Sequence, residues 1–263
     1  MGWPYAPGVC TVLVRIDPGA PWPLLLGAIR DEFVARSWDP PARHWVGPWA
    51  SFVGGRDQTA GGTWLAVDPS PGRPAVAALL NGPPLEPLAD GGARPTRGSL
   101  ALQALAGDPL PHGDELARYA RFHLLVATVT GTDLWSWDGE HLQHRVLTPG
   151  AHIVVNAGLD AADDPLVPHF APALAALDAP DLDHGSWGGW PELLTGEHLA
   201  GDDPRALVVA KEIEGRAYGT TSGALVALAA DGRTRYDFTA TPADASSWRP
   251  VSPGWSSGAP SGA

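Results

Sequence analysis

The sequence predicts an α+β domain made of two packed β-sheets with helices on their outer sides. Runs of strand-forming residues come first, helix-forming segments follow, and strand-forming runs return towards the C-terminus. Apolar residues make up 44% of the 263 residues and charged residues only 17%. Such a composition supplies enough apolar side chain for a sizeable core.

The chain is expected to open with a β-hairpin. The β-branched run over residues 10–17 reads as a strand that Pro18-Gly19 ends with a turn. A second apolar run of strand length follows at residues 22–29. Pairing of the two runs would bring Arg30 and Asp31 back to the start of the first strand.

The remaining elements are predicted from hydrophobic periodicity and turn residues. A Pro- and Trp-rich loop is expected over residues 37–51. Strands are expected at 62–68, 75–81, 122–130, 133–138, 143–148, 152–155, 206–213, 223–229 and 234–239. Helices are expected at 99–106, with Ser99 as N-cap, at 114–120, and within 168–198 with an interruption at 185–190.

One domain is expected over residues 10–250. Residues 1–9 are aperiodic and read as a tail, and residues 251–263 are rich in Ser, Gly and Pro and are predicted to be a disordered tail. The N-terminus has neither the basic nor the apolar part of a signal peptide. No apolar run reaches the roughly 20 residues of a membrane helix, so we expect a cytoplasmic protein without stable membrane insertion.

Charge and cysteine content exclude several classes of function. The formal net charge is −12, which disfavours nucleic acids and anionic membranes as partners because both need a basic face. The single cysteine, Cys10, excludes an internal disulfide framework and a cysteine-based zinc site. His141 and His144 lie three residues apart without a carboxylate pattern, so no metal site is expected. The sequence leaves the oligomeric state open.

Six ordered blocks then carry a resemblance to a known family. They are Cys10-Thr-Val-Leu-Val; Pro23 to Phe33 with Arg30-Asp31-Glu32-Phe33; Gly55-Arg-Asp followed by Gly-Gly-Thr-Trp64-Leu; Ala77 to Asn81 with Arg97-Gly-Ser-Leu; Leu147 to Asp160; and Tyr218-Gly-Thr with Trp248. In this order they resemble the NRDE family, the transport and Golgi organisation 2-like proteins. Ile29 stands where the namesake motif has Asn.

The resemblance implies a cysteine N-terminal-nucleophile (Ntn) hydrolase fold, a four-layer αββα sandwich with mostly antiparallel sheets. In such enzymes the cysteine is the first residue of the mature chain. Its thiolate attacks an amide carbonyl, and its own α-amine acts as the base. The implied ligand is a small amide or acyl compound, and no cofactor is required.

The same resemblance assigns roles to five residues. Cys10 would be the nucleophile, Asp31 would orient the cysteine or its amine, and Arg30 would be a charge partner. Asn81 would help to form the oxyanion hole, and Asn156 would lie near the amine.

Three further residues are candidates for substrate contact: Trp64, Arg56 and Thr221. Thr221 stands where relatives carry an Arg after Tyr-Gly-Thr. Each assignment has a structural alternative. A lone cysteine in a strand is often a buried apolar side chain, Arg30 and Asp31 can form a salt bridge that locks the hairpin, and Arg56 can pair with Asp57.

The position of Cys10 requires a further hypothesis, because removal of Met1 alone cannot free its amine. Translation that starts at a GTG codon for Val9, followed by methionine removal, would expose Cys10. Cleavage of residues 1–9 as a propeptide would have the same result.

A second function stays open beside the enzyme. The family resemblance also implies a binding or trafficking protein for haem or acyl lipids on a retained hydrolase fold. The absence of an Arg at Thr221, the Ile29 substitution and the 12 tryptophans favour this alternative. His44 and His152 are conceivable axial ligands for a haem.

Overall fold

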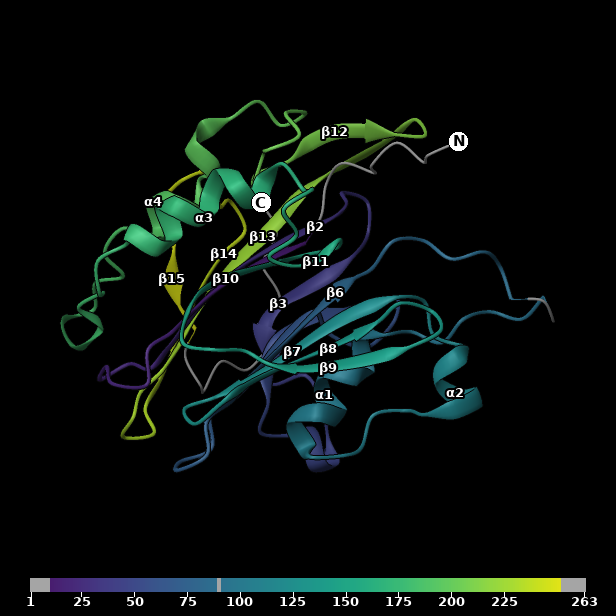
Figure 1. The fold of residues 1–263 in the computed structure, drawn as a ribbon, viewed down its shortest axis with the longest axis horizontal. Coiled ribbons are helices and arrows are strands. Elements are labelled where there is room, and N and C mark those ends of the chain that lie inside the picture. Colours follow the sequence, from purple (N-terminus) through teal and green to yellow (C-terminus); the bar gives the residue numbers. More distant parts are fainter. Residues whose placement is uncertain (1–9, 89–90, 252–263) are drawn as a thin grey trace, which may run out of the picture.

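The computed structural model describes residues 10–88 and 91–251, so the predicted tail at residues 1–9 and almost all of the one at 251–263 lie outside the described residues. Two antiparallel sheets stack face to face, with helices on the outer side of each sheet (Figure 1). The prediction of an α+β protein with two sheets is therefore confirmed.

The first sheet has the strand order β11-β10-β1-β2-β13-β14-β15, and β12 extends it by pairing with β13. Its strands are β1 (Thr11–Ile16), β2 (Leu24–Phe33), β10 (Gly150–Val155), β11 (Gly158–Leu159), β12 (Ala210–Ile213), β13 (Arg216–Leu228), β14 (Thr234–Thr239) and β15 (Arg249–Pro250). β1 and β2 form the expected hairpin, in which Thr11 pairs with Ile29.

The second sheet is a meander in which each strand pairs with the next one along the chain. Its strands are β3 (Trp38–Ala42), β4 (Val53–Asp57), β5 (Leu65–Asp68), β6 (Ala75–Asn81), β7 (Phe122–Thr128), β8 (Thr132–Trp137) and β9 (Leu142–Val146). Short connections suffice because antiparallel neighbours need no crossover.

The helices lie on the outer faces (Figure 1). α1 (Gly98–Ala106) and α2 (Gly113–Ala117) cover the second sheet, and α3 (Leu166–Ala176) and α4 (Trp190–Leu194) cover the first. Short 3₁₀ turns occur at Gly47–Trp49, Leu182–His184 and Gly196–His198. In the part of the chain that the structure describes, no helix is both long and apolar enough to span a bilayer.

The main core lies between the two sheets. Side chains alternate along each strand, so one set points inwards and the other towards the helices. On β1 and β2, Val12, Val14, Leu24 and Leu26 join the core between the sheets. Leu13 and Leu25 face the helices, with the fully buried Trp190 of α4 among their neighbours.

The structure corrects several sequence expectations. The predicted loop at residues 37–51 contains β3 and a 3₁₀ turn. Proline disfavoured a strand there, but β3 is the edge strand of its sheet, where a missing N–H is tolerated. The N-cap of α1 is Arg97 and not Ser99, because the helix already begins at Gly98. The expected helix at 114–120 ends earlier, at Ala117.

A β-bulge interrupts the pairing of β2 with β13. Thr220 lies opposite Asp31, and Ser222 lies opposite Arg30, so Thr221 is the extra residue between them. A bulge redirects nearby side chains and is frequent next to functional sites. This irregularity places three hydroxyl-bearing residues beside the Arg30-Asp31 segment.

Two glycines hold the start of α1 against the second sheet. A side chain on Gly62 would overlap the backbone of Gly98, and the N–H of Thr63 donates to the Gly98 carbonyl at 3.0 Å. The two backbones can approach this closely only without a Cβ. The contact fixes the segment that carries Arg97.

Gly62→Ala is therefore expected to destabilise the fold by about 1–3 kcal/mol, because the added methyl group has to displace backbone. Urea unfolding of the purified variant measures the loss. Gly131→Ala is the matched control, since the space around Gly131 is open, and its stability is expected to stay within about 0.5 kcal/mol of wild type. Equal stability of both variants would contradict the proposed backbone contact.

Candidate functional site

The β1–β2 hairpin brings Cys10 next to Asp31. Cys10 directly precedes β1, and its thiol donates a hydrogen bond to the Asp31 carbonyl oxygen, with a sulfur–oxygen distance of 3.6 Å. Both residues line a cavity of about 370 Å³ that also contains Arg30, Trp64 and Asn81. The structure thus brings together five of the eight residues that the sequence singled out.

The Cys10 thiol is neutral in this environment. Burial raises its pKa to about 11, and the negative charge of Asp31 adds to the effect. A thiolate is the reactive form of cysteine. In the described arrangement the sulfur therefore needs a base, or a change in its surroundings, before it can act as a nucleophile.

The Asp31 carboxylate is held by β13. The Thr220 hydroxyl donates to Asp31 Oδ1 at 2.6 Å, and the same hydroxyl accepts from the backbone N–H of Val209 at 2.8 Å. The chain of hydrogen bonds fixes the orientation of the acid. Asp31 and Arg30 are adjacent on a strand and point to opposite faces, so their side chains do not form the salt bridge considered as an alternative.

Arg30 is buried between the sheets, with 4% of its side chain exposed. Its guanidinium donates to the Thr221 hydroxyl at 2.8 Å and lies 4.3 Å from the centroid of the Trp64 ring. It also lies 3.9 Å from Asp57 and 3.8 Å from Glu32. Thr221 therefore contacts Arg30, the neighbour of the cysteine, and is absent from the cavity lining.

A second arginine completes this charge network. Arg36 Nε lies 2.5 Å from Asp57 Oδ2 and 3.6 Å from Glu32 Oε2. Arg36 holds the pKa of Asp57 below its usual range against the opposing effect of burial. Two arginines and two carboxylates thus neutralise each other on one wall of the cavity.

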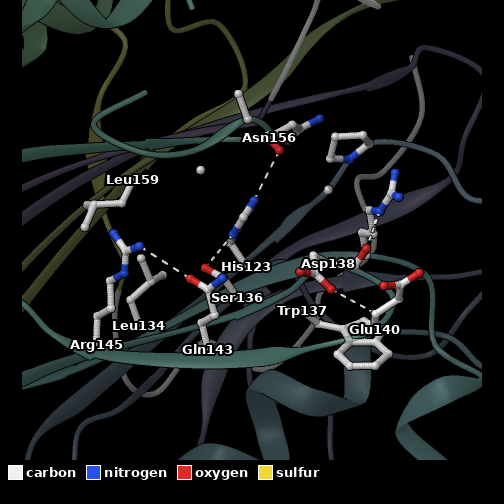
Figure 2. Close-up of a pocket in the computed structure, with 15 residues that line it drawn as sticks. His123, Leu134, Ser136, Trp137, Asp138, Glu140, Gln143, Arg145, Asn156 and Leu159 are labelled. Carbon is white, nitrogen blue, oxygen red and sulfur yellow. Dashed lines mark hydrogen bonds between the residues drawn. The ribbon is translucent and has the colours of Figure 1, made fainter. Parts of the chain in front are cut away.

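Asn81 and Asn156 have different positions. Asn81 ends β6 and lines the cavity of Cys10. Asn156 lines a neighbouring cavity of about 550 Å³ between β7–β9 and β10–β11 (Figure 2). The structure therefore does not place Asn156 in the lining of the Cys10 cavity, although Gly82, which follows Asn81, lines the same cavity as Asn156.

The neighbouring cavity contains a paired histidine and serine (Figure 2). His123 Nε2 lies 3.2 Å from the Asn156 carbonyl, which can only accept, so this nitrogen carries the proton. Nδ1 then accepts from the Ser136 hydroxyl at 2.8 Å. Burial lowers the pKa of His123, which keeps the ring neutral.

Arg56 does not contribute to either cavity. Its guanidinium pairs with Asp39 of the edge strand, with an Nη2–Oδ2 distance of 2.7 Å. Arg56 therefore forms an ion pair, as the structural alternative supposed, but its partner is Asp39 and not Asp57. Of the two conceivable haem ligands, His152 has both ring nitrogens in hydrogen bonds. Nδ1 is bonded to Asp160 Oδ2, and Nε2 is bonded to the Thr148 carbonyl.

The sequence reading missed several cavity residues. Arg36, Asp57, Arg94 and Arg97 line the cavity, and Thr220 holds Asp31. The Gly-Arg-Asp, Arg-Gly-Ser-Leu and Tyr-Gly-Thr blocks contain Asp57, Arg97 and Thr220, so the motifs pointed to three of them. Across residues 10–88 and 91–251, no cluster of three or more His, Cys, Asp or Glu side chains could hold a metal ion.

Alkylation of Cys10 by iodoacetamide is expected to accelerate about tenfold per pH unit from pH 7 to pH 10, because the thiolate population follows a pKa of about 11. Asp31→Asn removes a negative charge and lowers that pKa, so its reaction at pH 8 is expected to be several-fold faster. Mass spectrometry of the labelled chain gives the rates. A rate that is independent of pH over this range would contradict the raised pKa.

The pH dependence of stability is expected to change when His123 is replaced. Its folded-state pKa is depressed, so below about pH 6.5 the unfolded chain binds a proton that the folded chain does not. Stability therefore falls as the pH drops from 7 to 5, and His123→Gln makes this fall shallower in thermal unfolding. His152→Gln is the contrast, because Asp160 raises the pKa of His152 and this pair stabilises the protein at low pH.

Comparison with known proteins agrees with the motifs. A family model described as Transport and Golgi organisation 2 matches residues 9–168, more than half of the chain. This stretch contains Cys10, Asp31, Asn81 and Asn156, whereas Thr220 lies beyond it. A search of curated proteins found no match. The chain belongs to the Transport and Golgi organisation 2 family.

Proposed function

We propose that this protein is a cysteine amidohydrolase or acyltransferase of the Ntn type that acts on a small amide or acyl substrate. The observation that carries the proposal is the position of Cys10 at the head of β1, in a polar cavity with Asp31, Arg30 and Asn81. The two stacked sheets with helices outside are compatible with the αββα sandwich of that superfamily.

The proposed reaction starts at the Cys10 sulfur. The thiol proton passes to a free α-amine on the same residue, and the sulfur attacks the amide carbonyl. The tetrahedral intermediate collapses when the leaving amine takes up this proton, and a thioester remains on Cys10. Water then hydrolyses the thioester to the acid, or another amine or alcohol accepts the acyl group.

Two side chains support the charges of this reaction. The Asn81 carboxamide can donate a hydrogen bond to the developing oxyanion, a contribution of roughly 3 kcal/mol in related sites. Asp31, fixed by Thr220, can orient a protonated amine on Cys10. Asn156 lines the neighbouring cavity, so this reaction scheme does not use it.

The mechanism requires that the active chain begins at Cys10. A peptide nitrogen is not a base, and the raised pKa of the thiol makes spontaneous ionisation rare near neutral pH. A start at Val9 followed by methionine removal, or cleavage after residue 9, supplies the free amine. In the second case the inactive precursor and the active enzyme would differ only in the residues before Cys10.

The alternative is non-covalent binding of haem or an acyl lipid. The neighbouring cavity favours it, because at about 550 Å³ it is the larger space and it combines Leu134, Leu159 and Trp137 with polar side chains. Binding there requires neither a free amine nor a reactive thiol.

A chain that begins at Cys10 is expected to hydrolyse small acyl p-nitroanilides, whereas the full-length chain is not, because only the former has the base. Release of nitroaniline measures turnover, and Cys10→Ala in the shortened chain controls for background. Loss of turnover in Cys10→Ala without a change in the melting temperature supports the proposal. No turnover by either chain, together with a saturable Soret change on haem titration, would favour the binding function instead.

A further inference from the structure

The cavity beside Cys10 contains four arginines in two different environments. Arg30 and Arg36 face Asp57 and Glu32 within 4 Å. Arg94 and Arg97 form no ion pair within the described residues, and their guanidinium groups donate only to backbone carbonyls.

Arg97 lies at the start of α1. Its Nη1 donates to the Arg121 carbonyl at 2.7 Å, and this single bond leaves most of the five guanidinium N–H groups available. Burial lowers its pKa, which shows that the charge is partly removed from water. The backbone contact between Gly62 and Gly98 holds the neighbouring segment in place.

Arg94 is held even more firmly. It donates to the carbonyls of Arg118, Tyr119 and Glu86 at 3.1, 3.3 and 2.8 Å. These bonds fix the plane of the guanidinium. Its Nε is buried and has no hydrogen-bond partner among the described residues, although buried donors are nearly always satisfied.

Among the described residues, no carboxylate forms an ion pair with either of the two arginines. The nearby acids already have partners. Asp57 and Glu32 face Arg30 and Arg36. Asp31 accepts a hydrogen bond from Thr220. This local excess of positive charge occurs in a chain with a net charge of −12. Fixed, partly desolvated guanidinium groups are typical of sites that recognise carboxylate or phosphate.

We propose that Arg94 and Arg97 form a subsite for an oxyanionic group, a carboxylate or a phosphate, on the ligand that occupies the Cys10 cavity. The inference rests on the proposed function for the identity of the reaction, but the subsite itself can be tested without turnover. Such a subsite would define the substrate as an anionic amide or acyl compound. The oxyanion would be held at Arg94 and Arg97 while the reactive carbonyl faces the sulfur.

Binding is tested with glutarate and with inorganic phosphate as separate probes, titrated by calorimetry into full-length Cys10→Ala. Saturable binding of either probe is expected, and Arg97→Gln in this background is expected to weaken it at least tenfold. Arg97→Lys keeps the charge and is expected to retain part of the affinity. The tighter of the two probes identifies the oxyanion.

Arg73→Gln is the matched control. Arg73 is exposed and absent from the cavity lining, so this variant removes the same charge elsewhere and is expected to bind as the parent does. Equal binding by Arg97→Gln and the parent, or an equal loss in Arg73→Gln, would overturn the subsite. Melting temperatures of all variants show whether a loss of binding reflects a loss of fold.

Turnover separates the two proposals. For the chain that begins at Cys10, the ratio of kcat/KM for glutaryl-p-nitroanilide to that for uncharged valeryl-p-nitroanilide is expected to fall about tenfold in Arg97→Gln. Binding of glutarate without cleavage of either anilide would contradict the proposed reaction and leave the subsite standing. Cleavage of both anilides with an unchanged ratio would contradict the subsite and leave the proposed reaction standing.

Discussion

The arrangement of the site depends on the pairing of β2 with a neighbour on each side. β1 pairs with one edge of β2 as far as Ile29, directly before the Arg30-Asp31 segment, and β13 pairs with the other edge along this segment. The register with β1 places Cys10 beside this segment. The bulge in β13 supplies the hydroxyls of Thr220 and Thr221, which hold Asp31 and Arg30 respectively. A shift of either register by one residue would exchange the two faces of the strand and separate these groups.

Electrostatics inside the cavity follows from how the charges are distributed between its walls. One wall carries arginines and carboxylates that neutralise each other, and the other carries Arg94 and Arg97, which have no acidic partner in the part of the chain that the structure describes. Where exposure is low, as at Arg30, these interactions are stronger because water screens them less. The same low exposure raises the pKa of the Cys10 thiol. The suppressed ionisation of the sulfur and the proposed attraction for an anion therefore have a common origin in the burial of this end of the sandwich.

The two cavities divide the residues that the family motifs group together. Asn81 and Cys10 share one cavity, whereas Asn156 and His123 line the other. Asn81 lines the first cavity and Gly82 the second, and the Gly82 N–H donates to the Arg121 carbonyl at 2.9 Å. That carbonyl also accepts from Arg97.

The sequence by itself determined the two-sheet α+β class, the opening hairpin and the proximity of Cys10 to Asp31, because strand periodicity and turn residues act over short distances along the chain. It also identified Asn81 and Trp64 as neighbours of the site through their motifs. Only the tertiary structure decided that Arg56 pairs with Asp39, that Asn156 lines another cavity, and that Thr220 and Arg97 belong near the cysteine. These contacts join segments far apart in the sequence, and their geometry depends on sheet register, a bulge and the close approach of two glycines. No local pattern of residues specifies such features.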